Sequence, residues 1–280
     1  MRKYYYILAI NLFLSTFCRA QIDPMSLVKT VFSKDTFPEL ENHITGEYKG
    51  HPNGTDLPKN VKKDYLLLGE NEKTAVVNLT IIDSIGVEFD TYLHLVKEEN
   101  IWKIEAFRAL AMTGIIAQVK DELEKMTEAQ VDSMIEQYKK DTTAFSMFKS
   151  KEDYQFELGN ARLTLASDDN IIEHFKTNEI EFNRIKDSIQ KEIEEIKIEE
   201  ERTQSIGENY QNEYRTLFIS SISTGGYELV NCIDFRIGGM IDNTVGYFYV
   251  KDKKDVPEMN PSRIIMVREI GNGWYIYKTT

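Results

Sequence analysis

Four side chains capable of acid–base chemistry alternate along one short segment: Glu88, Asp90, Tyr92 and His94. Apolar residues also alternate over residues 87–96, which is typical of a β-strand. Because successive side chains of a strand point to opposite faces, we expect all four on one face. If that face lines an enclosed pocket, desolvation would raise the pKa of a carboxyl group and lower that of the histidine, poising Asp90 and His94 for proton transfer. If it faces water, the four are ordinary surface residues, which is the commoner situation.

Other patterns that carry chemistry are missing from the sequence. It contains no Walker-type phosphate loop, no GxGxxG motif after a strand, no GxSxG nucleophile elbow and no HExxH zinc motif. Four histidines and two cysteines do not predict a structural zinc site. We therefore expect no metal and no cofactor, and the four residues of the 87–96 segment are the only candidates for catalysis.

The N-terminus has the pattern of a secretory signal peptide. A basic start precedes an uncharged apolar run over residues 4–17, and the small residues Cys18 and Ala20 stand at the −3 and −1 positions of a cut before Gln21. A lipid anchor on Cys18 is the alternative. Cleavage after Ala20 would place the mature protein in the periplasm or outside the cell. It would leave Cys232 as the one cysteine, so no intramolecular disulfide could form.

Acidic residues outnumber basic ones, 46 against 34, which gives a formal net charge of −12. The leader contributes Arg2, Lys3 and Arg19 and no acid, so the mature chain carries a net charge of −15. A chain this acidic is repelled by nucleic acid, and we expect no nucleic-acid partner. No later segment approaches 18 consecutive apolar residues, so we expect no membrane span in the mature chain.

The elements that would position these residues are two small β-rich units. Residues 94–105 and 265–277 share one pattern, in which an apolar strand, a turn with Asn or Gly and a Trp-x-Ile strand follow one another. Such a pattern is typical of a β-hairpin. Trp102 and Trp274 open the returning strands, and we expect both to be buried.

The first unit resembles a known fold family. Asp23 and Pro24 begin a predicted helix, and a loop rich in proline and glycine follows it. Four strands are then expected, over residues 65–68, 74–82, 87–96 and 101–107. This order, with TYLHLVK at 91–97 and IWKI at 101–104, resembles the NTF2-like (cystatin-like cone) fold over residues 24–110. The resemblance implies helices on the concave face of the sheet, often around a pocket, in a family of binding domains, adaptors and a few enzymes.

The middle of the chain is predicted to be helical. Thr127 and Gln130 form a capping box that starts a helix over residues 128–140, after another at about 115–126. Residues 156–165 are interpreted as a strand with a turn at Gly159. Ser167 then caps a long amphipathic helix over residues 168–202, about 50 Å if unbroken. Its apolar stripe consists of Ile172, Phe175, Phe182, Ile185, Ile189, Ile193 and Ile196.

That stripe needs a partner, either another helix of this chain or a second chain. In the latter case the protein would be a homodimer through the helix at residues 172–196. Further strands are expected at 228–237 and 244–250, with a turn at Gly238 and Gly239.

The predicted fold class is α+β, with two small antiparallel-sheet units joined by a helical segment that includes the long amphipathic helix. The predicted organisation is a signal peptide at 1–20, an NTF2-like domain at 21–112, a helical connector at 113–150 and a second α+β domain at 151–280.

Three functional hypotheses follow. The first is an exported non-catalytic protein that binds a small molecule or another protein. The second is an NTF2-like enzyme with Asp90 and His94 as its acid–base pair. The third is a structural protein that assembles through the helix at 168–202.

Overall fold

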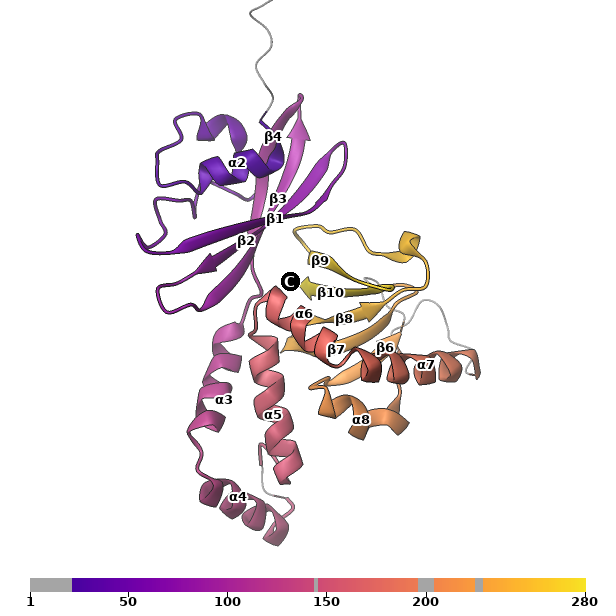
Figure 1. Cartoon of the computed structure of the whole chain (residues 1–280). Helices are drawn as coiled ribbons and strands as arrows, with labels where there is room; N and C mark the ends of the chain where they lie inside the picture. Colours follow the sequence, from indigo (N-terminus) through magenta and orange to yellow (C-terminus); the bar gives the residue numbers. More distant parts are fainter. Residues whose placement is uncertain (1–21, 144–145, 196–203, 225–228) are drawn as a thin grey trace, which may run out of the picture.

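The chain folds into two antiparallel sheets with a helical arm between them (Figure 1). The computed structural model describes residues 22–143, 146–195, 204–224 and 229–280, so the predicted signal peptide lies outside the described residues. One sheet has four strands and the other has six. The predicted α+β class is confirmed. No helix in the described ranges is long and apolar enough to cross a bilayer.

The first unit is a helix packed on a four-stranded antiparallel meander. Its elements are α2 (Pro24–Val31), η1 (Leu40–His43), β1 (Lys62–Glu70), β2 (Thr74–Ile82), β3 (Glu88–Glu98) and β4 (Ile101–Arg108), with the strands in sequence order. Asp23 caps α2 by accepting from the Ser26 N–H. Leu27 and Val28 of α2 share a core with Leu93 and Trp102, so the predicted burial of Trp102 is confirmed.

The second face of this sheet is also covered. We expected β3 to have one buried and one polar face, but every residue from Asp90 to Leu95 is buried. The reason is that the second unit packs against that face. Val76 and Tyr92 belong to the main hydrophobic core of the second unit, so one apolar core continues from one unit into the other. An antiparallel sheet usually keeps one face in water, and here that face is used for docking.

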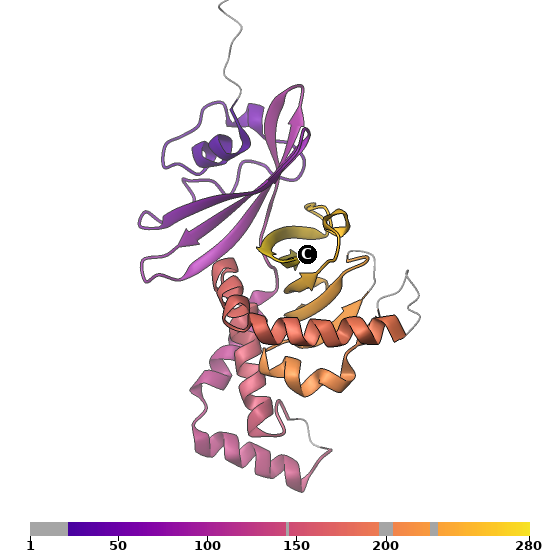
Figure 2. The same ribbon diagram turned by 45° about the vertical axis from the view of Figure 1, so that its right-hand side comes forward.

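The helical arm consists of α3 (Thr113–Lys125), α4 (Glu128–Lys140) and α5 (Lys151–Thr164). In Figures 1 and 2, α3 and α5 run side by side and α4 lies across their far ends. The predicted capping box at Thr127 and Gln130 is confirmed. The predicted strand at residues 156–165 is wrong, because α5 spans it. Gly159 is not a turn residue: a Cβ there would lie 2.1 Å from the Phe218 ring, so glycine permits a close approach.

The predicted long helix begins at Asp168 as expected but breaks at Asn178. It forms α6 (Asp168–Thr177) and α7 (Glu179–Glu195), while residues 196–202 lie outside the described ranges. Phe175, Phe182 and Ile189 of the apolar stripe are buried in the core of the six-stranded sheet. Figure 2 shows α7 lying along this sheet. The described part of the stripe therefore packs on this chain's own sheet, and the homodimer through this helix stays a prediction.

The second unit is completed by short helices and the six-stranded sheet. Its elements are β5 (Gln204–Ile206), η2 (Glu208–Tyr210), α8 (Gln211–Thr216), β6 (Ser221–Thr224), β7 (Ile233–Met240), β8 (Asn243–Tyr249), η3 (Lys253–Asp255), β9 (Ile264–Gly271) and β10 (Trp274–Thr279), and the sheet order is β5-β6-β7-β8-β10-β9. Trp274 is 0% exposed, which confirms its predicted burial. The turn predicted at Gly238 and Gly239 is wrong, because β7 runs through both glycines and turns at Ile241.

Candidate functional site

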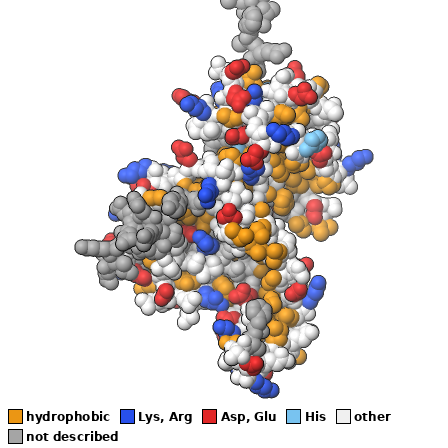
Figure 3. Space-filling view, turned by 180° about the vertical axis from the view of Figure 1, so that it is seen from behind, with side chains coloured by type: hydrophobic (Ala, Val, Ile, Leu, Met, Phe, Trp, Pro, Cys, Tyr) orange, Lys and Arg blue, Asp and Glu red, His pale blue; other side chains and the backbone are white. Residues whose placement is uncertain are grey.

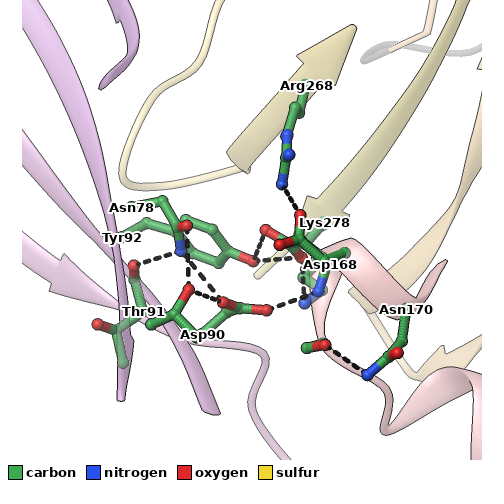
Figure 4. A network of polar contacts seen from close by, with 11 residues as sticks. Asn78, Asp90, Thr91, Tyr92, Asp168, Asn170, Arg268 and Lys278 are labelled. Carbon is green, nitrogen blue, oxygen red and sulfur yellow. Dashed lines mark hydrogen bonds and ion pairs between the residues drawn. The ribbon is translucent and has the colours of Figure 1, made fainter. Parts of the chain in front are cut away.

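The predicted acid–base residues lie where the two units meet. Figure 4 shows Asp90 and Tyr92 of β3 pointing toward the first turn of α6 and the side chain of Lys278 on β10. The Tyr92 hydroxyl is 2.9 Å from each carboxylate oxygen of Asp168. The Asp168 backbone N–H donates to Asp90 Oδ2 at 2.6 Å, and Lys278 Nζ is 2.7 Å from Asp168 Oδ1. We call Asp90, Tyr92, Asp168 and Lys278 the junction network.

The junction network is almost completely removed from water. Asp168 is 1% exposed and Lys278 4%. Burial raises the pKa of Asp168, and the charge of Lys278 opposes that rise. Burial also raises the pKa of Tyr92 well above its usual value, and the Asp168 carboxylate adds to the effect. Asp90 additionally accepts from Thr80 Oγ1 at 2.5 Å, so the buried charges of the network are held by several hydrogen bonds.

His94 and Glu88 stand apart from this network. His94 Nε2 lies 3.1 Å from the carbonyl oxygen of Ile265, and since a carbonyl only accepts, Nε2 carries the proton. Burial lowers the pKa of His94 to about 4, so the ring is neutral at neutral pH. Glu88 is half-buried at the rim. Asp90 and His94 are four residues apart on one strand, about 13 Å at 3.3 Å per residue, too far for direct proton transfer.

The junction has little room for a substrate. The two cavities beside it measure about 90 and 50 Å³, and they are lined by Glu88, Asp90, Ser167 and their neighbours. Sites for small molecules are usually about 300–1,000 Å³, whereas these hold a few waters at most. The geometry therefore makes the junction network a clasp between the units. It offers no support for Asp90 and His94 as an acid–base pair.

Two members of the clasp, Asp168 and Lys278, were not among the predicted site residues. They are 110 positions apart in sequence and meet only through the fold. One signal was present: Lys278 is the single charged residue of β10, in the otherwise apolar run WYIYKT. A lone charge in a buried strand indicates a paired partner, because an unpaired buried charge is strongly destabilising.

A larger hollow lies along α5. A groove of about 470 Å³ separates α3 from the end of the β7–β8 hairpin, with α5 as its floor. Its lining residues, which define the α3 groove, are Ile115, Ile116, Val119, Glu157, Asn160, Ala161, Thr164, Ser220, Arg236, Gly238, Gly239, Ile241 and Thr244. Ile115 is 51% exposed and Ile241 82%. The apolar face at the start of α3 is thus left without a full covering.

Figure 3, which views the molecule from behind, places this groove in context. Apolar side chains gather where the first unit meets the helical arm and continue along the arm. Phe89 and Leu110 line the small cavity that adjoins the α3 groove at Thr164. Phe89 is itself half-exposed. An apolar surface that continues over several elements is a common sign of a binding site.

Two polar side chains, Thr164 and Glu157, lie at the base of the groove, and the first has no partner among the described residues. The side chain of Thr164 is 2% exposed, yet its Oγ1 has no hydrogen bond within the described part of the chain. A Cβ at Gly238 would lie 2.4 Å from this oxygen, so the hydroxyl faces the glycine strand. The carboxylate of Glu157 is half-buried; burial raises its pKa, and the charge of Arg215 opposes that rise. Buried polar groups normally have partners, so the Thr164 hydroxyl indicates a missing one.

Other hollows carry their own internal pairs. In a cavity of about 590 Å³ beside the start of α5, the Arg215 guanidinium stacks 3.7 Å above the Phe156 ring and pairs with Asp153 at 2.8 Å. A shallow cavity of about 650 Å³ near η1 is rimmed by glutamates, of which Glu98 pairs with Lys103. No cluster of side chains suited to a metal ion occurs among the described residues.

Comparison with models of known protein families, with curated proteins and with solved structures finds no match.

Proposed function

We propose that this is an exported, non-catalytic binding protein whose ligand occupies the α3 groove. The observation that carries the proposal is the uncovered apolar face of α3, opposite the β7–β8 hairpin, in a groove of about 470 Å³. That volume is in the usual range for ligand sites, and the groove combines apolar walls with a few polar groups. The junction network has neither property.

The clasp supports this function indirectly: it fixes the first unit on the second, and α3, one wall of the groove, follows directly after β4 of the first unit. A binding groove keeps its shape only if its walls do not move relative to each other, because ordering a loose site on binding costs free energy. The shared core through Val76 and Tyr92, together with the Lys278–Asp168 ion pair, limits such movement. On this proposal, Asp90, Tyr92 and His94 serve docking of the units and perform no reaction.

Export and family are proposed on the sequence pattern. The apolar run at residues 4–17 and the cut before Gln21 support export, and the helix followed by a four-stranded meander supports an NTF2-like assignment for residues 24–110. N-terminal sequencing of the protein recovered from outside the cytoplasm tests export. We expect it to begin at Gln21, and an intact Met1 or a lipid on Cys18 would contradict this.

Selective labelling of isoleucine methyl groups tests the groove. A panel of small apolar and amphipathic fragments should shift the NMR signals of Ile115, Ile116 and Ile241 together. Ile180, which is 87% exposed on α7 and does not line the groove, is the control for non-specific contact. If fragments shift no groove signal, or shift Ile180 as strongly, the groove is not the binding site.

A further inference from the structure

One backbone edge of the second sheet ends inside the α3 groove. Strand β6 pairs with residues 233–236 of β7, whereas β7 continues to Met240 with β8 as its partner on the other side. Among the described residues, the last part of β7 is therefore a strand edge. Gly238 and Gly239, which form this edge, both line the groove. An unpaired strand edge presents backbone N–H and C=O groups that another chain can pair with.

The pairing pattern identifies the outward groups. The β7–β8 turn has two residues, Ile241 and Asp242, so Met240 and Asn243 close the hairpin as a hydrogen-bonded pair. In an antiparallel ladder such pairs alternate with pairs whose backbone groups point away from each other. Gly239, paired with Thr244, is in the second class. Its N–H and C=O therefore point away from β8, toward the groove.

The chain already fills the neighbouring position with a side chain. Asn160 of α5 donates from Nδ2 to the carbonyl oxygens of Phe218 and Ile237, at 2.8 and 2.5 Å. Strand β6 does not extend to Ile237, and the Asn160 amide supplies the donor that a neighbouring strand would give to the Ile237 carbonyl. Gly239 has no equivalent partner among the described residues outside its own ladder. A Cβ at Gly239 would lie 2.1 Å from the carbonyl oxygen of Asn243, so glycine is required here by the close approach of β8.

The walls of the groove suit the side chains of an extended peptide. Along a bound strand, successive side chains alternate between two directions. One set would face Ile115, Ile116 and Val119 of α3, which line the same groove as Gly239. The Glu157 carboxylate adds a negative charge at the base, close enough to Arg215 to feel its charge, and the one basic residue of the described lining, Arg236, is paired with Asp234 at 3.6 Å. The whole chain is also acidic, with a net charge of −12, so a basic peptide is complementary to it.

We infer that the α3 groove binds an extended, basic segment of another polypeptide by strand addition at Gly239. The segment pairs its backbone with Gly239, places an apolar side chain against Ile116 and brings a lysine or arginine to Glu157. This rests on the proposed function, because it names the ligand class for the same groove. Peptide recognition of this kind takes affinity from main-chain hydrogen bonds and specificity from alternate side chains.

The test begins with a displayed library of random heptapeptides selected against the mature chain. We expect enriched peptides to alternate apolar residues and to contain a lysine or arginine. Each enriched peptide is then synthesised with one backbone nitrogen methylated at a time, which removes one donor at a time. Methylation at the position that pairs with Gly239 should weaken binding at least about tenfold, which is roughly 1.4 kcal/mol. Methylation at the adjacent positions should have little effect.

Variants of the groove locate the peptide. Ile116→Glu and Ile241→Lys should each weaken binding at least tenfold, and Ile241 lies in an exposed turn where folding is not at risk. Glu157→Gln should weaken binding of the basic peptides more than that of variants with the lysine replaced. Ile180→Glu is the matched control and should bind as the unaltered chain does. Circular dichroism of each variant confirms that it is folded.

The outcomes separate this inference from the proposed function. Enriched peptides that bind Ile116→Glu and Ile241→Lys normally, or that tolerate methylation at every position, would overturn strand addition. A library that yields no peptide, while fragments still shift the groove isoleucines, would overturn the peptide inference and leave the binding function standing. If neither fragments nor peptides bind, both the peptide inference and the proposed binding function are wrong.

Discussion

The junction network and the α3 groove both lie near the end of α5, and they treat polar and apolar groups in opposite ways. At the junction, charged side chains are buried and fully engaged, as the Lys278–Asp168 pair shows. In the groove, apolar side chains such as Ile115 remain half-exposed, and the Thr164 hydroxyl has no partner in the described residues. Side chains with catalytic potential hold the fold together here, and side chains that resemble ordinary core are partly uncovered, which is why we propose them as the ligand contacts.

This difference follows from the energetics of burial. A charge taken out of water is tolerated only with partners, so the junction can be assembled only in one arrangement of the two units. Apolar groups are not directional, and an uncovered patch can accept several shapes. The junction therefore suits specific docking, and the groove suits recognition. Four predictions, from the largest expected effect to the smallest, test this contrast.

Removing the lysine of the clasp should have the largest effect. Lys278→Met leaves the buried Asp168 carboxylate without its cation, and breaking a buried pair in this way costs about 3–5 kcal/mol. Urea unfolding followed by tryptophan fluorescence measures the loss. Lys254→Met is the control, because Lys254 pairs with Asp252 on the exposed surface, where an ion pair contributes about 0–1 kcal/mol. Equal effects of the two substitutions would remove the distinction between clasp and surface.

The buried imidazole should make stability depend on pH. The pKa of His94 is about 4 in the folded protein, below its ordinary value of about 6.5 in an unfolded chain. The stability from this residue is therefore complete above about pH 6.5, and on the order of 3 kcal/mol is lost as the pH falls to about 4. His94→Gln keeps a donor for the Ile265 carbonyl and removes the titrating group, so its stability should fall less over this range.

A second buried group, Asp234, also makes the free energy of unfolding depend on pH, in the opposite direction to His94. Burial raises the pKa of Asp234 to about 6, so its contribution to stability is complete below about pH 4 and is lost as the pH rises through 6. Both chains contain Asp234, so subtracting the stability-against-pH curve of His94→Gln from that of the unaltered chain cancels the contribution of Asp234. His51→Gln, at an exposed position, is the control. Parallel profiles for the His94→Gln and unaltered chains would show that His94 is not buried as described.

Deleting one hydroxyl from the junction should have an intermediate effect. Tyr92→Phe removes the hydrogen bonds to Asp168 and leaves that carboxylate less satisfied, at a cost of about 1–3 kcal/mol. Tyr138→Phe in α4, where no hydroxyl bond occurs in the described ranges, should change the free energy of unfolding by less than about 0.5 kcal/mol. Denaturant titration of both variants measures the change. If Tyr92→Phe leaves the free energy of unfolding unchanged, the junction is accessible to water.

A substitution in the groove should change the free energy of unfolding least, and in the stabilising direction. Thr164→Val replaces a buried, unpartnered hydroxyl with a methyl group of similar shape, so stability should stay constant or rise, by up to about 1 kcal/mol. If the hydroxyl serves a ligand, binding of the selected peptides should weaken in the same variant. A clear loss of stability would instead show that the Thr164 hydroxyl forms a hydrogen bond in the fold.

Ser167 provides the contrasting variant. Ser167→Ala removes the acceptor for the Asn170 side chain and should destabilise the protein.

Much of the local structure was predictable because it depends on neighbours in sequence. Strand β2 has the predicted bounds, Thr127 caps α4 as expected, and both tryptophans are buried. The helix α5 was missed because Gly159 and Asn160 are turn-forming residues by type. Their reasons lie in distant contacts. Gly159 makes room for the Phe218 ring, and Asn160 donates to the backbone carbonyls of Phe218, in the turn after α8, and of Ile237 in β7.

The site was less predictable for the same physical reason. Alternation correctly grouped Asp90, Tyr92 and His94 on one face of β3, but it could not show that a second unit covers that face. The α3 groove depends on an absence, the gap between α3 and the β7–β8 hairpin. In the sequence, Ile115, Ile116 and Val119 have the spacing of ordinary core residues, and only the fold shows that they are partly uncovered.

The most direct measurement is a crystal structure of the mature chain bound to a selected heptapeptide. We predict a peptide in the α3 groove, with its main chain about 2.9 Å from the backbone N–H and C=O of Gly239. Its side chains should contact Ile116, and the Lys278–Asp168 pair should be unchanged. A peptide bound between β3 and α6, with the junction network opened to receive it, would contradict the division of the molecule into a structural clasp and a binding groove.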